Sequence, residues 1–278
     1  MKALLLSAGR GERLRPLTDN WPKCLMPIRG IPLLGYWLRK FSLAGLDKVF
    51  VNTHWQCDPV FGYLNIAEHG VLVEPIYEPC LLGTAGTLRL LKNELNDDSF
   101  IVAHGDNYTD LDLNRLIDFH GSHNKPISMV TFQTRYPERS GIVEISSEGI
   151  LIDFHEKVAN PPSNNANAAI YVFDPIVLEV IMKDETILDI SVDLIPRFLG
   201  NIKCFSHNGF NIDIGSSKEL VRAQKNQINV LHTPKGKLSQ FLKIFPEFKR
   251  ENKRIQNQRS TKTRKRTENM LCMWRVFD

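Results

Sequence analysis

The sequence predicts an α/β protein: a mainly parallel sheet with helices on both faces, joined in the second half of the chain by an antiparallel elaboration. Two observations support this prediction. Up to about residue 126, short apolar runs typical of buried parallel strands alternate with segments of helical periodicity. Beyond that point, strand-like runs follow one another across turns with few helices between them. With 278 residues, of which 42% are hydrophobic, the chain is long enough to bury a large core.

The first half contains four predicted strands. They are residues 2–7, 49–52, 71–76 and 100–103. Apolar residues recur at helical spacing over residues 33–41, and Gly45 is expected to end that helix. Another helix is expected at Thr84, whose hydroxyl can cap it. In such a Rossmann-like arrangement ligands bind beyond the carboxyl ends of the strands, where residues 8–15 and Asp106 fall.

The second half is predicted to belong to the same domain. Its expected strands are residues 127–133, 142–145, 150–154 and 168–173. Its expected helices are residues 175–182, 191–198 and a closing helix at 216–231. Because these strands are separated by turns, they are expected to pair in antiparallel fashion beside the parallel sheet.

Net charge divides the chain into two parts. Residues 1–234 carry 22 Lys and Arg against 27 Asp and Glu, whereas residues 235–278 carry 13 against 4. We therefore predict one domain over residues 1–234 and a basic, partly disordered extension over residues 235–278. No aromatic residue lies among the basic clusters of residues 249–266, and the extension matches no nucleic-acid-binding module. Nucleic acid is not its expected partner, although a nucleic-acid-binding protein that acts through this tail stays an alternative.

Cysteine usage and hydropathy favour a cytoplasmic protein. The five cysteines are scattered and include no Cys-x-x-Cys pair, which argues against a disulfide framework or a zinc site. The apolar run at residues 3–6 is too short for a signal peptide, and no run approaches the roughly 20 residues that span a bilayer. No membrane partner is expected, and self-association into a homo-oligomer stays open.

The turn after the first strand predicts an anion site. Gly9 and Gly11 let backbone N–H groups approach a phosphate, and Arg13 and Arg15 supply charge-assisted contacts. Lys23 is expected to bring a further cation to the same turn. The third glycine of a dinucleotide-binding fingerprint and the Lys-Ser/Thr of a Walker A loop are both missing.

Seven segments in order resemble the sugar-1-phosphate nucleotidyltransferases, also called sugar-nucleotide pyrophosphorylases. They are residues 6–16 with Pro22 and Lys23, residues 82–86, Gly105 with Asp106, residues 141–143, Glu156 with Lys157, residues 167–171, and residues 213–215. The resemblance covers roughly residues 1–230 and implies the nucleotide-diphospho-sugar transferase fold. It also implies a reaction in which a sugar 1-phosphate oxygen attacks the α-phosphorus of a nucleoside triphosphate and pyrophosphate leaves.

The resemblance assigns roles to residues of this chain. The catalytic group it implies is Arg13, Lys23 and Asp106, and the nucleotide-binding group is Ala8, Gly9, Gly11, Gly83 and Thr84. Sugar 1-phosphate would bind at Asn107, Gly141, Glu156, Lys157 and Asn167. Asp106 and Asp213 would hold Mg²⁺, a cofactor that prefers carboxylate and phosphate oxygens.

Among family members the chain looks most like the mannose-1-phosphate guanylyltransferases, which favours GTP and a mannose-like 1-phosphate as substrates. A glucose-1-phosphate thymidylyl- or uridylyltransferase, or a non-catalytic regulatory subunit that binds nucleotide sugars, stays as an alternative. Three positions depart from the family pattern. Glu12 replaces Thr, Ala169 replaces the Gly of an Asn-x-Gly segment, and Asn211 replaces an aromatic residue. These departures leave the implied reaction unchanged but bear on the sugar.

Overall fold

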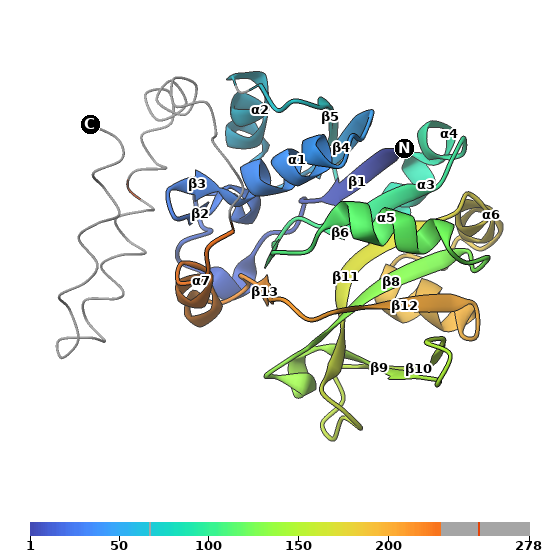
Figure 1. Ribbon diagram of the computed structural model, residues 1–278. Helices are drawn as coiled ribbons and strands as arrows, with labels where there is room; N and C mark the ends of the chain where they lie inside the picture. Colours follow the sequence, from blue (N-terminus) through green and yellow to red (C-terminus); the bar gives the residue numbers. More distant parts are fainter. Residues whose placement is uncertain (67, 229–249, 251–278) are drawn as a thin grey trace.

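A computed structural model describes residues 1–66, 68–228 and 250 (Figure 1). The predicted domain boundary at 234 and the basic extension apart from Arg250 lie outside the described residues. Within the described residues, nine strands form one sheet, in the order β10–β9–β11–β6–β1–β4–β5, with β8 paired to β11 and β12 paired to β8. The predicted α/β architecture is confirmed.

The strands β6, β1, β4 and β5 run parallel, whereas β11 is antiparallel to β6 and carries the rest of the sheet. The bounds in the large sheet are β1 Lys2–Leu6, β4 Lys48–Thr53, β5 Leu72–Tyr77, β6 Phe100–His104, β8 Ile127–Gln133, β9 Gly141–Ile145, β10 Leu151–Glu156, β11 Asn165–Phe173 and β12 Ile202–His207. Two small ribbons pair β2 (Pro27–Ile28) with β3 (Ile31–Pro32) and β7 (Asn107–Thr109) with β13 (Asn211–Asp213).

The helices cover both faces of the sheet (Figure 1). They are α1 Leu33–Leu43, α2 Cys57–Ile66, α3 Thr84–Leu90, α4 Lys92–Leu95, α5 Leu113–Gly121, α6 Ile176–Lys183 and α7 Ser217–Ala223. Short helical turns occur at η1 Glu12–Leu14, η2 Lys23–Leu25, η3 Pro137–Arg139, η4 Ile190–Leu194 and η5 Ile195–Phe198. Among the described helices, none is long and apolar enough to cross a membrane.

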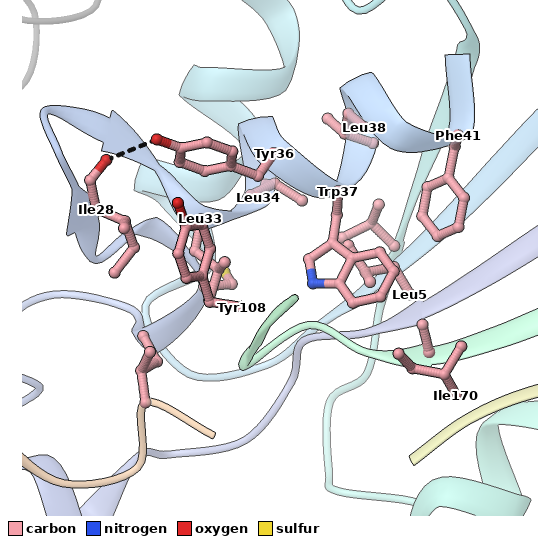
Figure 2. Packing of buried hydrophobic residues seen from close by; sticks show 14 of the residues in the cluster. Leu5, Ile28, Leu33, Leu34, Tyr36, Trp37, Leu38, Phe41, Tyr108 and Ile170 are labelled. Carbon is pink, nitrogen blue, oxygen red and sulfur yellow. Dashed lines mark hydrogen bonds between the residues drawn. The ribbon is translucent and has the colours of Figure 1, made fainter. Parts of the chain in front are cut away.

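Alternation along the strands divides the core into two clusters. Leu5 of β1 belongs to the cluster formed with α1, α2, α5 and α7, while its neighbour Leu4 belongs to the cluster formed with α3, α4 and α6. Figure 2 shows Trp37 of α1 directed toward Leu5 and toward Ile170 of β11. The Trp37 indole donates a hydrogen bond of 2.8 Å to the Asn107 carbonyl, so this fully buried ring also has its polar group satisfied.

Three local predictions were wrong. The closing helix expected over residues 216–231 ends at Ala223, and a turn follows in which the Gln224 side chain bonds to the backbone of Arg29 and Pro27. The helix expected over residues 191–198 is a π-helical turn, η4, followed by the 3₁₀ turn η5, and Pro196 in η5 lacks the N–H that a continuous α-helix needs. Thr84 does not cap α3 but is its first residue, and Gly83 precedes it with φ 81°. The Thr84 hydroxyl instead donates to Asp189 and accepts from the Ile190 N–H.

The parallel strands end at a common edge. Leu6 of β1 is in register with Asn52 of β4 and with His104 of β6. The turns that follow β1 and β6 therefore begin side by side, as the parallel topology requires. A hydrogen bond of 2.8 Å from the Gly105 N–H to the Leu6 carbonyl joins these two turns. This edge positions the candidate site.

Candidate active site

A buried lysine and two aspartates form the centre of the site. Lys23, at the start of η2, is 8% exposed, and its Nζ lies 2.6 Å from Oδ2 of Asp106 and 2.9 Å from Oδ1 of Asp213. Arg13 adds a bond of 3.0 Å from Nη2 to the other Asp213 oxygen. The structure thus brings together four predicted site residues that come from four separate segments.

The backbone explains how the two aspartates meet. Asp106 lies in the turn between β6 and β7, and Asp213 ends β13, which pairs with β7 in antiparallel register. The Ile214 N–H donates to the Asp106 carbonyl over 3.0 Å, and the Gly215 N–H donates to the Asp213 carboxylate over 2.7 Å. The small β7–β13 ribbon therefore fixes the separation of the carboxylates.

Charge pairing keeps this centre ionised. Burial lowers the pKa of Lys23, but the carboxylates of Asp106 and Asp213 outweigh it, so the pKa lies above its ordinary value. Burial raises the pKa of Asp106, but Lys23 and then His104 outweigh it and hold that pKa below its ordinary value. Charge pairing thus favours the ammonium form of Lys23 and the carboxylate form of Asp106.

Three adjoining pockets are each lined in part by residues of this centre. The first, of about 230 Å³, is lined by the segments around Ala8, Asn52, Gly83 and Gly105. The middle pocket, of about 390 Å³, is lined by residues 9–13 and shares Lys23 and Asp106 with the first. The outer pocket, of about 740 Å³, shares Arg13 and Gly215 with the middle one. The pockets form a continuous path along the carboxyl edge of the sheet, with Lys23 and Asp106 at the junction of the first two.

The glycine turn leaves its backbone open toward the pockets. A Cβ on Gly9 would meet no atom within 4 Å, so this backbone faces open space in the first and middle pockets. Gly11 is glycine for a different reason, because its φ is +65° and a Cβ would lie 2.9 Å from the Thr18 side chain. Ala8 is 6% exposed and lines the first pocket.

The Gly83–Thr84 segment forms another wall of the first pocket. Gly83 has φ +81°, and a Cβ there would lie 2.3 Å from the Leu188 carbonyl oxygen. That oxygen accepts a hydrogen bond of 3.0 Å from the Ala85 N–H. The Arg89 guanidinium donates to the carbonyls of Ile181, Asp184 and Ile187 and so holds the segment that leads to Leu188. The second half of the chain therefore supports a wall of the pocket.

A buried polar network behind the first pocket escaped the sequence analysis. Asn52 accepts from the Ser7 N–H over 2.5 Å and donates to Oε1 of Glu78 over 2.9 Å. The Thr87 hydroxyl donates to the same Glu78 oxygen over 2.6 Å, and Oε2 accepts from the Leu82 N–H over 3.3 Å. Glu78 is 1% exposed and lines the pocket. An acidic residue two positions after the strand predicted at residues 71–76 was the available signal.

Three of the predicted sugar-binding residues, Gly141, Glu156 and Lys157, belong to β9, to β10 and to the residue that follows β10. Oε1 of Glu156, at the end of β10, lies 2.5 Å from Nζ of Lys157, and Lys157 lines the outer pocket. Gly141 of β9 is packed, since a Cβ would lie 2.5 Å from the Phe154 ring and 2.6 Å from the Glu156 carboxylate. Their roles in sugar binding stay predictions.

The two remaining asparagines hold the backbone of β11. Asn107 donates 2.9 Å to the Ala168 carbonyl, and Asn167 accepts 2.9 Å from the Ala169 N–H while donating 2.6 Å to the Tyr171 hydroxyl. The strand pairing shifts register between Asn167 and Tyr171, and Ala169 has φ +53°. A glycine would adopt this conformation without strain, which gives a backbone reason for Gly at this position in relatives.

Residues 2–229 match the nucleotidyl transferase family. The chain belongs to this family of enzymes. It is 31% identical over 258 residues to a candidate mannose-1-phosphate guanyltransferase from Sulfolobus acidocaldarius, covering 89% of this chain and 70% of that relative. It is 32% identical over 228 residues to a mannose-1-phosphate guanylyltransferase catalytic subunit beta from Drosophila pseudoobscura pseudoobscura, covering 79% of this chain and 60% of the relative, so it spans less than two thirds of the latter.

One solved structure has a fold similar to that of this chain. It is that of a candidate glucose-1-phosphate thymidylyltransferase from Bacillus anthracis in complex with sucrose, with a TM-score of 0.74 and 23% identity, covering 81% of this chain and 94% of that one. At this identity the likeness concerns the fold.

The departures from the nucleotidyl transferase pattern have distinct surroundings. Glu12 is exposed at the start of η1 and lines the middle pocket. Asn211 is 6% exposed in β13, where its amide donates 3.5 Å to the Ala168 carbonyl. Its Oδ1 has no hydrogen-bond partner among the described residues. Glu12 therefore faces the predicted phosphate path, whereas Asn211 supports the backbone beside it.

Proposed function

We propose that the protein transfers a guanylyl group from GTP to mannose 1-phosphate or a similar sugar 1-phosphate, giving a GDP-sugar and pyrophosphate. The observation that carries this proposal is the Lys23–Asp106–Asp213 cluster at the junction of a glycine-walled pocket and an arginine-lined one. The nucleoside would occupy the first pocket and the triphosphate the middle one. Nucleotidyl transferase membership and the two relatives' names support the reaction class.

The chemistry needs positioning and charge neutralisation. An oxygen of the sugar 1-phosphate attacks the α-phosphorus, the bond from that phosphorus to the bridging oxygen breaks, and pyrophosphate departs with the electron pair. Because the attacking phosphate oxygen is already anionic, no general base is required. Lys23 and Arg13 would stabilise the charge on the phosphoryl oxygens, which is worth about 10² to 10³ in rate for one such preorganised donor.

The residues fit a magnesium ion. Asp106 and Asp213 present two hard carboxylates to the same path, and they already surround a cationic group, the Lys23 ammonium. Mg²⁺ bound to these carboxylates would supply additional positive charge against the phosphates. Lys23 would also donate to a phosphate oxygen, since an ammonium group has three N–H donors and the two aspartates accept from two of them.

Glu78 supports the preference for guanine. An ionised carboxylate only accepts hydrogen bonds, and guanine presents two adjacent N–H donors along one edge, whereas uracil and thymine present one. Oε2 of Glu78 receives one protein N–H, that of Leu82, at 3.3 Å, among the described residues. We expect Glu78→Gln to reduce activity with GTP more than activity with UTP.

The test is a matrix of GTP, UTP, dTTP and ATP against mannose 1-phosphate and glucose 1-phosphate, with Mg²⁺, read as pyrophosphate release. The proposal predicts the highest kcat/KM for GTP with mannose 1-phosphate and no release after a chelator removes the metal. A higher value for dTTP or UTP with glucose 1-phosphate would favour the thymidylyl- or uridylyltransferase alternative. Binding of nucleotide sugars without release from any pair would favour the regulatory alternative. Cytoplasmic residence and homo-oligomer formation stay predictions.

A further inference from the structure

The outer pocket carries more positive charge than the proposed reaction uses. Six cationic side chains line it: Arg13, Arg135, Arg139, Lys157, Lys218 and Arg222. Three carboxylates line it as well, and each already has a partner. Asp213 binds Arg13 and Lys23, Glu138 lies 3.3 Å from Arg139, and Glu219 lies 2.9 Å from Arg222. The lining therefore has an excess of positive charge.

Arg135 and Lys218 supply much of this excess. Neither has a carboxylate within ion-pair distance among the described residues, and both are exposed. Arg135 comes from the loop after β8 and Lys218 from α7, so two segments far apart in sequence bring like charges to one pocket. Like charges in proximity cost free energy in the absence of a counterion. Their arrangement is suited to an anion with several charged oxygens.

Tyr136 holds two of the cations over the pocket. Its hydroxyl accepts a bond of 2.5 Å from Nζ of Lys218, which also lies 4.8 Å from the centre of the ring. The Arg139 guanidinium lies 5.6 Å from the same ring centre. Cation–π attraction offsets part of the repulsion between these groups and orders them before any ligand binds.

The position of the pocket identifies the kind of anion. The outer pocket shares Arg13 and Gly215 with the middle pocket, where the triphosphate would bind. Of the five predicted sugar-binding residues, Lys157 alone lines it within the described part of the chain. The outer pocket therefore shares two residues with the triphosphate pocket and one, Lys157, with the predicted sugar 1-phosphate site.

We propose, on the basis of the function proposed above, that the outer pocket is a secondary binding site for pyrophosphate. Pyrophosphate that leaves the middle pocket would reach this site past Arg13, which lines both pockets. The shared chemistry is that of a multiply charged phosphate anion, and inorganic phosphate from solution is the other source of it. Arg135 and Lys218 set the affinity of this secondary site for pyrophosphate.

The first test titrates inorganic pyrophosphate alone into the full chain, so the result does not depend on turnover. The double variant Arg135→Gln/Lys218→Gln is expected to lose about tenfold in affinity. The matched control Arg115→Gln/Lys225→Gln removes two exposed cations that do not line the pocket and is expected to bind as the unchanged protein does. Unchanged affinity in the double variant, or tighter binding of inorganic phosphate than of pyrophosphate, would overturn the proposal.

The second test measures product inhibition with the substrates that turn over best. The double variant is expected to raise the inhibition constant of pyrophosphate about tenfold while leaving the KM values for both substrates within about twofold. A raised KM for the sugar 1-phosphate with an unchanged inhibition constant would assign the pocket to the acceptor instead. Absence of turnover in every protein tested would contradict the proposed function, while the first test would still measure the affinity of the secondary site for pyrophosphate.

Discussion

The carboxyl edge of the parallel strands and the antiparallel extension place their polar groups in opposite ways. At the parallel edge, Gly9 faces open space, Lys23 and Asp106 line the first and middle pockets, and Asp213 lines the outer one. In the extension, Asn167 of β11 bonds to the Ala169 N–H and the Tyr171 hydroxyl of its own strand, and the Ala168 carbonyl of that strand accepts from Asn107 of β7. The difference teaches that a family motif can mark either a group that is available to a ligand or a group that shapes the backbone around it.

The largest effect expected at the parallel edge follows from Asp106→Asn. Loss of the negative charge removes both the ion pair with Lys23 and the predicted metal ligand, so we expect kcat to fall about 10³-fold. Pyrophosphate release with Mg²⁺ measures this. The control Asp97→Asn neutralises an exposed aspartate that pairs with Lys2 and should change kcat less than about twofold. Activity within tenfold of the unchanged protein would refute the role of Asp106.

Two glycine substitutions separate folding from ligand approach. Gly83→Ala requires a side chain at φ +81° against the Leu188 carbonyl, so we expect about 3 kcal/mol less free energy of unfolding. Gly9→Ala adds a methyl group to open space and should leave that free energy within about 0.5 kcal/mol while raising the KM for the nucleotide about 10- to 100-fold. Urea denaturation and initial rates give the two values. An unchanged KM in Gly9→Ala would mean that no phosphate approaches this backbone.

The ion pairs of Lys23 predict a stability window in pH. The pKa of Lys23 is raised above 10.5, so its stabilisation is complete below that pH and is lost as pH rises through the folded-state value. The pKa of Asp106 is lowered below 3.8, so its stabilisation is complete above that pH and is lost as pH falls. The difference in unfolding free energy between the unchanged protein and Lys23→Met should therefore be widest between these limits and narrow outside them.

Chemical denaturation across the pH range measures that difference. Lys183→Met, on an exposed residue at the end of α6, serves as the control and should show no comparable window. A difference that stays constant from pH 3 to pH 11 would contradict the ion-pair account.

The smallest effect concerns the extension. Ala169→Gly relieves a side chain at φ +53° but adds freedom to the unfolded chain, so we expect a gain of less than about 1 kcal/mol in unfolding free energy. Thermal unfolding measures it, with Ala166→Gly in regular β11 as the destabilised control. A clear loss of stability in Ala169→Gly would show that the methyl group contributes packing that outweighs the backbone strain.

Local sequence patterns predicted the parallel strands and the position of the site, because apolar runs and carboxyl-edge loops are properties of neighbouring residues. The pattern at residues 191–198 failed because Pro196 lacks the N–H that a continuous α-helix needs at that position. Resemblance supplied Asp213 as a partner of Asp106, and spacing alone could not, since the contact depends on β13 pairing with β7. Glu78 was missed because a single carboxylate carries no periodic signal, and its network forms only when β4, β5 and α3 assemble.

The β7–β13 ribbon has a consequence for synthesis of the protein. Asp213 lies 190 residues after Lys23, and translation adds roughly 5 to 20 residues per second, so the glycine turn and Lys23 exist for roughly 10 to 40 s before their last partner is made. An incomplete chain therefore has the cations of the phosphate path without the carboxylate that β13 brings. Under the proposed role of Asp213, capacity for nucleotidyl transfer arises only after residue 213 has been made.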